Sequence, residues 1–171
     1  MVGVLRWEQT GKLESRLYSG EAEIASLSWA SRHGSLATGL AQGKSWTFKR
    51  AGFLRPRVTV RDTGSSIDAA VLTLGWRPDG TVTFSDGEAF HLKRSGVLHP
   101  KWSISDTKGR ELLMLVPKMG LRRVECEVAV EKEVPRTLLL ATLGWYVILL
   151  TSHADYDVAG STAAVMAATS A

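Results

Sequence analysis

A run of apolar residues near the C-terminal end constrains the fold of this chain more than any other feature. The segment RTLLLATLGWYVILLTS follows Pro135, and no charged side chain occurs between Arg136 and His153. Proline is favoured in the first turn of a helix, so the pattern predicts a helix over about residues 136–151. A helix that is apolar on every side must be enclosed, either by lipid or by protein.

Length favours one of these two enclosures. About 15 helical residues span roughly 22 Å, whereas the hydrocarbon core of a bilayer is about 30 Å thick. A short membrane anchor flanked by Arg136, Asp155 and Asp157 stays open as the alternative. We favour a helix buried inside a closed β-sheet, where Gly144 lets a strand approach closely. The side chains expected to point outward in all directions are Leu139, Leu143, Trp145, Tyr146 and Leu149.

Two segments of the chain repeat each other at a constant offset of 44 residues. Residues 43–63 read GKSWTFKRAGFLRPRVTVRDT and residues 87–107 read GEAFHLKRSGVLHPKWSISDT, with eight identities over 21 positions. Chance would give about one or two identities, so we interpret the match as an internal duplication. Each copy alternates apolar and polar residues on both sides of a glycine and a proline, which predicts two strands around a turn.

The remaining strand predictions follow from similar patterns. Apolar or alternating runs predict strands at residues 70–74, 81–84, 112–116 and 124–130. The first forty residues are ambiguous, since residues 2–7, 17–24 and 27–29 fit strands but also permit helix. The regular spacing of turns predicts a mainly β protein, an antiparallel barrel of about twelve strands, internally duplicated, that encloses the C-terminal helix.

Three parts of the chain resemble the tubby-like superfamily, which includes LURP-one-related and phospholipid scramblase proteins. They are ISDTKGRELL at residues 104–113, DGEAF at residues 86–90 and the apolar segment 138–150. The resemblance covers residues 1–152 and implies one twelve-stranded barrel threaded by the helix. It also implies phosphoinositide binding, as in some members, or a role in lipid movement, as proposed for others. This chain is shorter than the tubby pattern. Its tail, residues 153–171, is rich in Ala, Ser and Thr and is expected to be disordered.

The residue types of catalytic and metal sites do not form a recognisable constellation. The sequence GLAQGKS at residues 39–45 lacks the first glycine of a phosphate-binding loop, and a strand is expected after it, so we interpret it as a solvated turn. Cys126 alternates with valines and is expected to be a buried core residue beside acidic neighbours that raise its pKa. We therefore predict no enzyme, no metal and no cofactor. The four histidines show no ligand spacing and are His33, His91, His99 and His153.

A repeated basic pair is the best functional lead in the sequence. Equivalent strands of the two copies end in Lys-Arg, and further basic residues follow the next turn, so we expect one rim that attracts phosphate groups. The alternative is that these residues only guard strand ends against edge pairing and keep the surface soluble. The candidate anion-binding or lipid-binding residues are Lys49, Arg50, Arg55, Arg57, Lys93, Arg94 and Lys101.

Composition agrees with such a partner without identifying it. The formal net charge is +4 and the isoelectric point is about 9.4, which suits an anionic phospholipid or membrane surface. A protein partner without any lipid ligand is the second hypothesis. Nucleic acid ranks third because the aromatic residues occupy core positions of strands. A single cysteine and an N-terminus without a secretory signal predict a cytoplasmic protein, peripheral at the membrane if it binds lipid.

Overall fold

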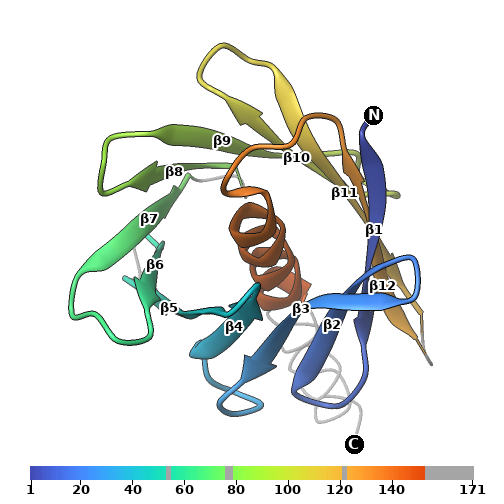
Figure 1. Ribbon diagram of the computed structural model, residues 1–171, viewed down its shortest axis with the longest axis horizontal. Coiled ribbons are helices and arrows are strands. Elements are labelled where there is room, and N and C mark those ends of the chain that lie inside the picture. Colours follow the sequence, from blue (N-terminus) through green and yellow to red (C-terminus); the bar gives the residue numbers. More distant parts are fainter. Residues whose placement is uncertain (53–54, 76–78, 121–122, 153–171) are drawn as a thin grey trace, which may run out of the picture.

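The computed structural model describes residues 1–52, 55–75, 79–120 and 123–152. Twelve antiparallel strands form a closed barrel, in which each strand pairs with its neighbours in the chain and β12 pairs with β1. One helix, residues 137–152, occupies the middle of the ring (Figure 1). The strands are β1 (Gly3–Gln9), β2 (Glu14–Ser19), β3 (Ala22–Trp29), β4 (Ala37–Ala41), β5 (Lys44–Ala51), β6 (Arg57–Asp62), β7 (Asp68–Leu74), β8 (Gly80–Phe84), β9 (Ala89–Ser95), β10 (Lys101–Asp106), β11 (Glu111–Met119) and β12 (Val124–Val130).

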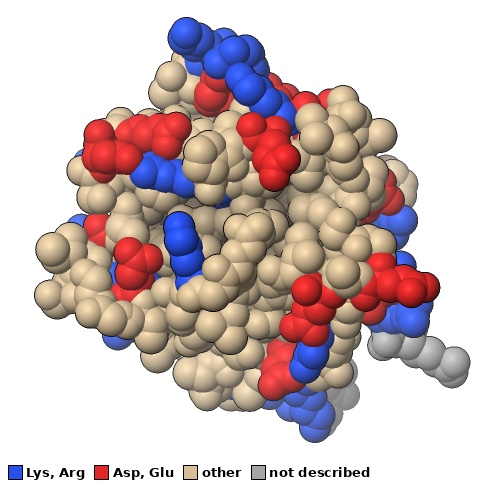
Figure 2. All heavy atoms as spheres, in the orientation of Figure 1, with Lys and Arg blue, Asp and Glu red and all other residues tan. Residues whose placement is uncertain are grey.

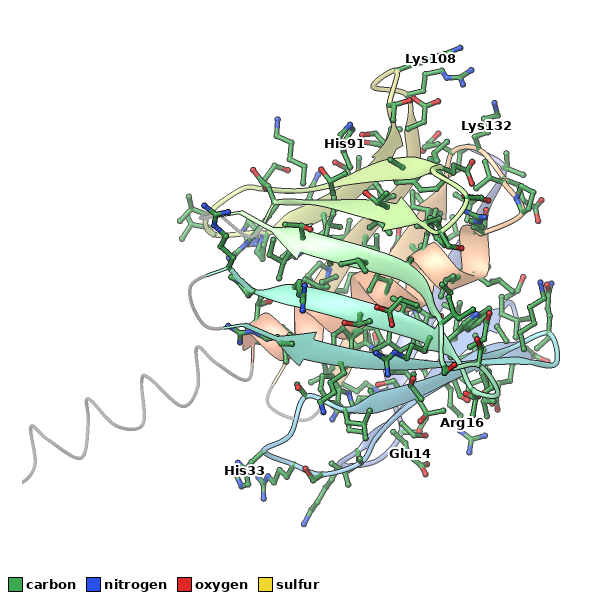
Figure 3. All side chains as sticks on the ribbon, turned by 90° about the vertical axis from the view of Figure 1, so that its left-hand side faces the viewer. Glu14, Arg16, His33, His91, Lys108 and Lys132 are labelled. Atoms are coloured by element: carbon green, nitrogen blue, oxygen red, sulfur yellow. The ribbon has the colours of Figure 1, made fainter. Side chains whose placement is uncertain are left out.

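The turns of this barrel alternate between its two ends, because neighbouring strands are antiparallel. The proximal rim holds the turns β2–β3, β4–β5, β6–β7, β8–β9 and β10–β11 and the connection from β12 into the helix. The distal rim holds the turns β1–β2, β3–β4, β5–β6, β7–β8, β9–β10 and β11–β12 and the end of the described helix. Seen from the side, His33 lies at the distal end, and Lys108 and Lys132 lie at the proximal end (Figure 3).

The barrel and the helix form one hydrophobic core. About eight strands close tightly enough to be filled by their own side chains, whereas twelve leave space for another element. The helix fills that space. The ring of Trp145 stacks on Trp7 of β1 at 6.2 Å between centroids, and the ring of Tyr146 stacks on Trp29 of β3 at 4.9 Å and on Phe48 of β5 at 5.5 Å. The prediction of a buried helix with side chains pointing outward in all directions is confirmed.

Two buried hydroxyl groups of the helix each donate a hydrogen bond to a backbone carbonyl. The Thr142 hydroxyl is fully buried and donates to the Leu138 carbonyl at 2.7 Å. The Tyr146 hydroxyl donates to the Ser35 carbonyl at 2.5 Å. Burial raises the pKa of Tyr146 well above its ordinary value, so the phenol keeps its proton and its role as donor.

Two glycines show how closely the helix packs. A Cβ atom at Gly39 of β4 would lie 2.8 Å from the Phe48 ring and 3.0 Å from Cγ2 of Thr142, so the strand backbone comes close to the helix there. At Gly144 the groups that approach are the Leu115 and Ile104 side chains, the nearest at 3.0 Å. The close approach of a strand that was predicted at Gly144 is therefore made by side chains of β10 and β11, and Gly39 allows the same closeness from the side of β4.

The first forty residues contain strands and no helix among the described residues. The predicted run 17–24 spans two strands, β2 and β3, because Gly20 adopts a φ of 60° and reverses the chain between them. The strand β4 falls in a stretch that the sequence patterns left unassigned. The expected turn within residues 39–45 is present at Gln42 and Gly43, both of which have positive φ.

The helix begins one residue later than predicted, at residue 137. The barrel encloses it, which rules out the membrane-anchor alternative for this segment. Across the described ranges, no helix combines the length and the hydropathy that a membrane crossing requires. The predicted disordered tail, residues 153–171, lies outside the described residues.

Candidate functional site

All seven basic residues singled out in the sequence lie at the distal rim. They belong to the hairpins β5–β6 and β9–β10, which the structure places at the same end of the barrel. Residues 49–57 and 93–101 contain no Asp or Glu, and their basic side chains contribute seven positive charges. The whole chain carries only +4, so the rest of the molecule is net negative. Positive charge is thus concentrated in two short hairpins.

Strand alternation sends the two members of each Lys-Arg pair to opposite faces of the sheet. Phe48 and Leu92 are buried, so the next residues, Lys49 and Lys93, point outward. Arg50 and Arg94 then lie on the inner side, at the mouth of the barrel. The Arg94 guanidinium lies 5.8 Å from the centre of the Trp102 ring, and this contact holds the Arg94 side chain at the rim.

Each hairpin brings two outward-facing basic residues close together. Lys49 pairs with Thr59 and Ala51 pairs with Arg57, so Lys49 and Arg57 are diagonal neighbours on the outer face. Lys93 and Lys101 occupy the same relation in β9 and β10. Such neighbours have Cα atoms about 7–8 Å apart, which suits adjacent anionic groups.

The two hairpins do not converge on a single point. The strands β7 and β8 lie between β6 and β9 in the barrel. At about 4.8 Å per strand, the centres of the two hairpins are about 20 Å apart. The basic residues therefore form two clusters on one rim, a spacing that fits an extended surface better than one small anion.

None of the seven residues forms an ion pair among the described residues, although carboxylates pair with basic side chains elsewhere in the barrel. The exposed Lys49, Arg50, Arg55, Arg57, Lys93 and Lys101 and the half-buried Arg94 lack a carboxylate within ion-pair distance. The basic residues that do pair with an acidic side chain are Arg6, Arg16, Arg61, Arg110, Lys118, Arg123 and Arg136.

Two exposed apolar residues at the tip of β9–β10 were missed by sequence reasoning. Val97 is 92% exposed and Leu98 is 87% exposed. The signal was present in the alignment of the two repeats, since GFLRP and GVLHP both place two apolar residues in a turn where solvated residues are usual. The equivalent residues of the other hairpin, Phe53 and Leu54, lie outside the described residues.

The backbone of this tip depends on Gly96, which has a φ of 77°. A Cβ atom there would lie 2.5 Å from the His99 carbonyl oxygen, so only glycine fits. The Arg94 amide also donates to Oδ1 of Asp79 at 2.9 Å, which fastens the β7–β8 turn to the base of the hairpin. The apolar pair is therefore held out from the barrel by a defined turn.

The proximal rim has a different character. Acidic and basic side chains lie next to one another on this face (Figure 2). Arg136, at the start of the helix, forms ion pairs with Asp86 and with Glu88, the latter at 2.9 Å, and its guanidinium lies 3.8 Å from the centre of the Phe84 ring. The hydrogen bond from Arg136 holds the pKa of Asp86 below its ordinary value. These contacts fasten the helix to the β8–β9 turn.

Two adjoining pockets indent the proximal rim, with volumes of about 790 Å³ and 500 Å³. Both are lined by Gln42, Glu133, Thr137 and Leu138. The larger one also contains Arg136, whose charge is already neutralised by Asp86 and Glu88. Its other charged lining residues, Lys44, Asp62 and Glu133, are of both signs, so the pocket lacks the single sign of charge found in the two distal hairpin segments.

The other reactive residue types are structural or dispersed. Cys126 is fully buried, as predicted, and burial is the main cause that raises the pKa of its thiol, with Glu127 a smaller one. The predicted acidic contribution is thus present, from Glu127, and burial adds the larger one. His91 contacts the Thr81 hydroxyl at 3.3 Å. Within the described part of the chain, no three His, Cys, Asp or Glu side chains gather as metal ligands.

The fold and this site define a closed β-barrel with a central helix and a basic, apolar-tipped distal rim. Comparison of the chain with protein-family models, with curated proteins and with solved structures returned no match. The function must therefore be argued from the site itself.

Proposed function

We propose that this protein is a non-catalytic module that docks its distal rim onto a membrane surface containing anionic phospholipid. One observation carries the proposal: seven basic side chains, in two hairpin segments (residues 49–57 and 93–101) without any acidic residue, have no carboxylate partner among the described residues. Each Lys or Arg near an anionic bilayer contributes about 1 kcal/mol of attraction, so two clusters of three or four suffice for stable docking.

The geometry supports a planar partner. Two clusters about 20 Å apart on one rim can contact several headgroups at once, whereas no single phosphate spans them. Outward-facing Lys49 and Arg57, and likewise Lys93 and Lys101, are spaced to contact separate headgroup phosphates. Arg50 and Arg94 supply planar guanidinium groups, which bind phosphate oxygens in bidentate fashion.

Protection of a strand edge does not account for these residues. Basic side chains often prevent pairing at the open edge of a sheet. In this barrel β1 pairs with β12, so the sheet has no open edge. The seven charges repel one another, and a counter-charge outside the protein explains why they are tolerated.

We further infer that the barrel arose by internal repetition, within the tubby-like superfamily that the sequence resembles. Register shifts at Val60/Arg61 in β6 and at Ile104/Ser105 in β10 lie 44 residues apart, the offset of the sequence repeat. A third shift, at Leu17/Tyr18 in β2, precedes the first by four strands. This supports a four-stranded unit present three times. The basic hairpin is then a feature of the repeated unit. We also propose that the protein lies at the cytoplasmic face of a membrane.

Vesicle co-sedimentation tests the proposal. The full chain is expected to sediment with vesicles of phosphatidylcholine and phosphatidylserine, to stay in solution with phosphatidylcholine alone, and to bind less as salt rises. Replacement of Lys49, Arg50, Lys93 and Arg94 by Ser should weaken binding at least tenfold, while the melting temperature falls by only about 2–4 °C because Arg94 loses its contact with Trp102. Equal sedimentation with both vesicle types, or unchanged binding of the variant, would refute the proposal.

A further inference from the structure

We propose that the tip of the β9–β10 hairpin inserts Val97 and Leu98 into the acyl region of the bilayer. This inference rests on the proposed function and specifies how the rim engages its partner. The two side chains are 92% and 87% exposed, more than any other large hydrophobic residue described in the structure. Because the two side chains are adjacent, they together expose apolar surface to water, which is unfavourable in free energy.

The order of residues along the hairpin matches the layers of a membrane. The apolar pair occupies the turn, and Lys93 and Lys101 flank it on the two strands just below. When the tip enters the boundary between headgroups and acyl chains, these lysines lie at the level of the phosphates. Lysine stems can extend along apolar surface while the ammonium group stays in the polar layer.

Several contacts make the tip a preformed element. Gly96 reverses the chain in a conformation that excludes a Cβ atom, and Pro100 fixes the backbone at the start of β10. The Ser95 hydroxyl contacts the Lys101 carbonyl at 3.5 Å across the base of the turn. Little ordering is therefore required when the tip meets the membrane, which favours binding.

Other exposed apolar residues lack this setting. Ile67 is 71% exposed, but it lies at the proximal rim, in the β6–β7 turn. Its neighbours in the turn include Asp62 and Asp68, so the local charge does not attract anionic lipid. Ile67 is therefore a matched control for the tip.

An environment-sensitive probe on the full chain tests insertion. Leu98→Cys is labelled with a nitrobenzoxadiazole fluorophore, and Thr107→Cys, on the exposed β10–β11 turn of the proximal rim, is labelled as the control. Cys126 is fully buried, and unlabelled wild type measures its background reaction. With phosphatidylserine vesicles, the probe at position 98 should shift to the blue and be quenched by brominated acyl chains. The probe at position 107 should do neither.

A second variant separates insertion from charge attraction. Val97→Ser combined with Leu98→Ser keeps every charge and is expected to weaken vesicle binding about three- to tenfold. It should also remove the fraction of binding that survives high salt, whereas Ile67→Ser should change neither quantity.

The outcomes distinguish the two proposals. If the labelled protein co-sediments with anionic vesicles but the probe at position 98 neither shifts nor is quenched, insertion is wrong and the docking proposal stands. If the protein fails to co-sediment with anionic vesicles, both are wrong. If the Ser double variant binds vesicles as tightly as wild type, the tip does not contribute to membrane binding and the insertion proposal is wrong.

Discussion

The start of the helix, at the proximal rim, and the two basic hairpins of the distal rim use basic residues in opposite ways. At the proximal rim Arg136 contacts two carboxylates and an aromatic ring, and its charge is neutralised within the protein. At the distal rim seven basic residues have no carboxylate partner within the described chain, beside exposed Val97 and Leu98. Arg136 is thus part of the folded structure, whereas the basic hairpins are the part of the molecule for which we propose a partner.

The helix is the element that the proximal rim holds in place, and its removal should have the largest effect. Eight of its large hydrophobic side chains are buried, and each contributes about 1.5–3 kcal/mol, against a total stability of about 5–15 kcal/mol for a domain. Deletion of residues 135–171 should therefore abolish the fold. Near-ultraviolet circular dichroism and thermal melting measure this. A truncated chain with a wild-type melt would show that the barrel stands without its helix.

Matched Arg→Met changes at the two rims should differ in stability. Arg136→Met loses two partly exposed ion pairs and a cation–π contact, so we expect a loss of about 1–2 kcal/mol, reduced by salt. Arg50→Met should change stability by less than about 0.5 kcal/mol, because Arg50 has no ion pair within the described chain. Urea unfolding of both variants measures the difference. Equal losses of stability in the two variants would show that Arg136 and Arg50 do not differ in what they contribute to the folded state.

The helix is held near the distal rim by a neutral contact. Tyr146→Phe removes the hydrogen bond to the Ser35 carbonyl, and we expect a loss of about 1–2 kcal/mol. Since no charge is involved, this loss should not change with salt, unlike that of Arg136→Met. Urea unfolding at low and high salt separates the two. A salt-dependent loss in Tyr146→Phe would contradict the assignment.

The Arg136 contacts also predict a small dependence on pH. The folded state lowers the pKa of Asp86 below its ordinary value of 3.8, mainly through the hydrogen bond from Arg136. The carboxylate therefore stabilises the fold above that value, and the stabilisation is lost as pH falls through the lower folded pKa. Asp86→Asn should melt below wild type at neutral pH, with a gap that closes in acid. Asp62→Asn, a change at an exposed carboxylate without an ion pair in the described chain, is the matched control.

Some parts of the fold could be predicted because their signals are local. The apolar run 137–152 requires an enclosure, and the alternation of valines with acidic residues over 124–130 is sufficient to predict β12. The turn at Gly20 was missed, since a single glycine between two short alternating runs is compatible with one continuous strand. Strand β4 was missed because its sequence, ATGLA, contains small residues. Packing around Gly39 decides where these residues lie against the helix.

The candidate site was predictable as a set of residues but not as an arrangement. The repeat identified the Lys-Arg pairs, and the closed topology was needed to place them at one rim. Their separation by β7 and β8, and the lack of carboxylate partners among the described residues, depend on contacts distant in sequence. Val97 and Leu98 were overlooked although both repeats place two apolar residues in this turn, because the sequence does not show whether such residues are buried or exposed.

The central claim is that the distal rim, and not net charge, binds the membrane, and a charge-matched pair of variants tests it most directly. Lys49, Lys93 and Lys101 are replaced by Ser at the distal rim, and Lys44, Lys108 and Lys132 at the proximal rim. All six lysines are exposed and without ion pairs in the described chain, and either set lowers the formal net charge from +4 to +1.

Affinity for phosphatidylserine vesicles is measured for both variants. The distal variant should bind about tenfold to a hundredfold more weakly than wild type, whereas the proximal variant should stay within about twofold. Equal weakening by the two variants would contradict the claim, because it would mean that total charge alone governs the attraction.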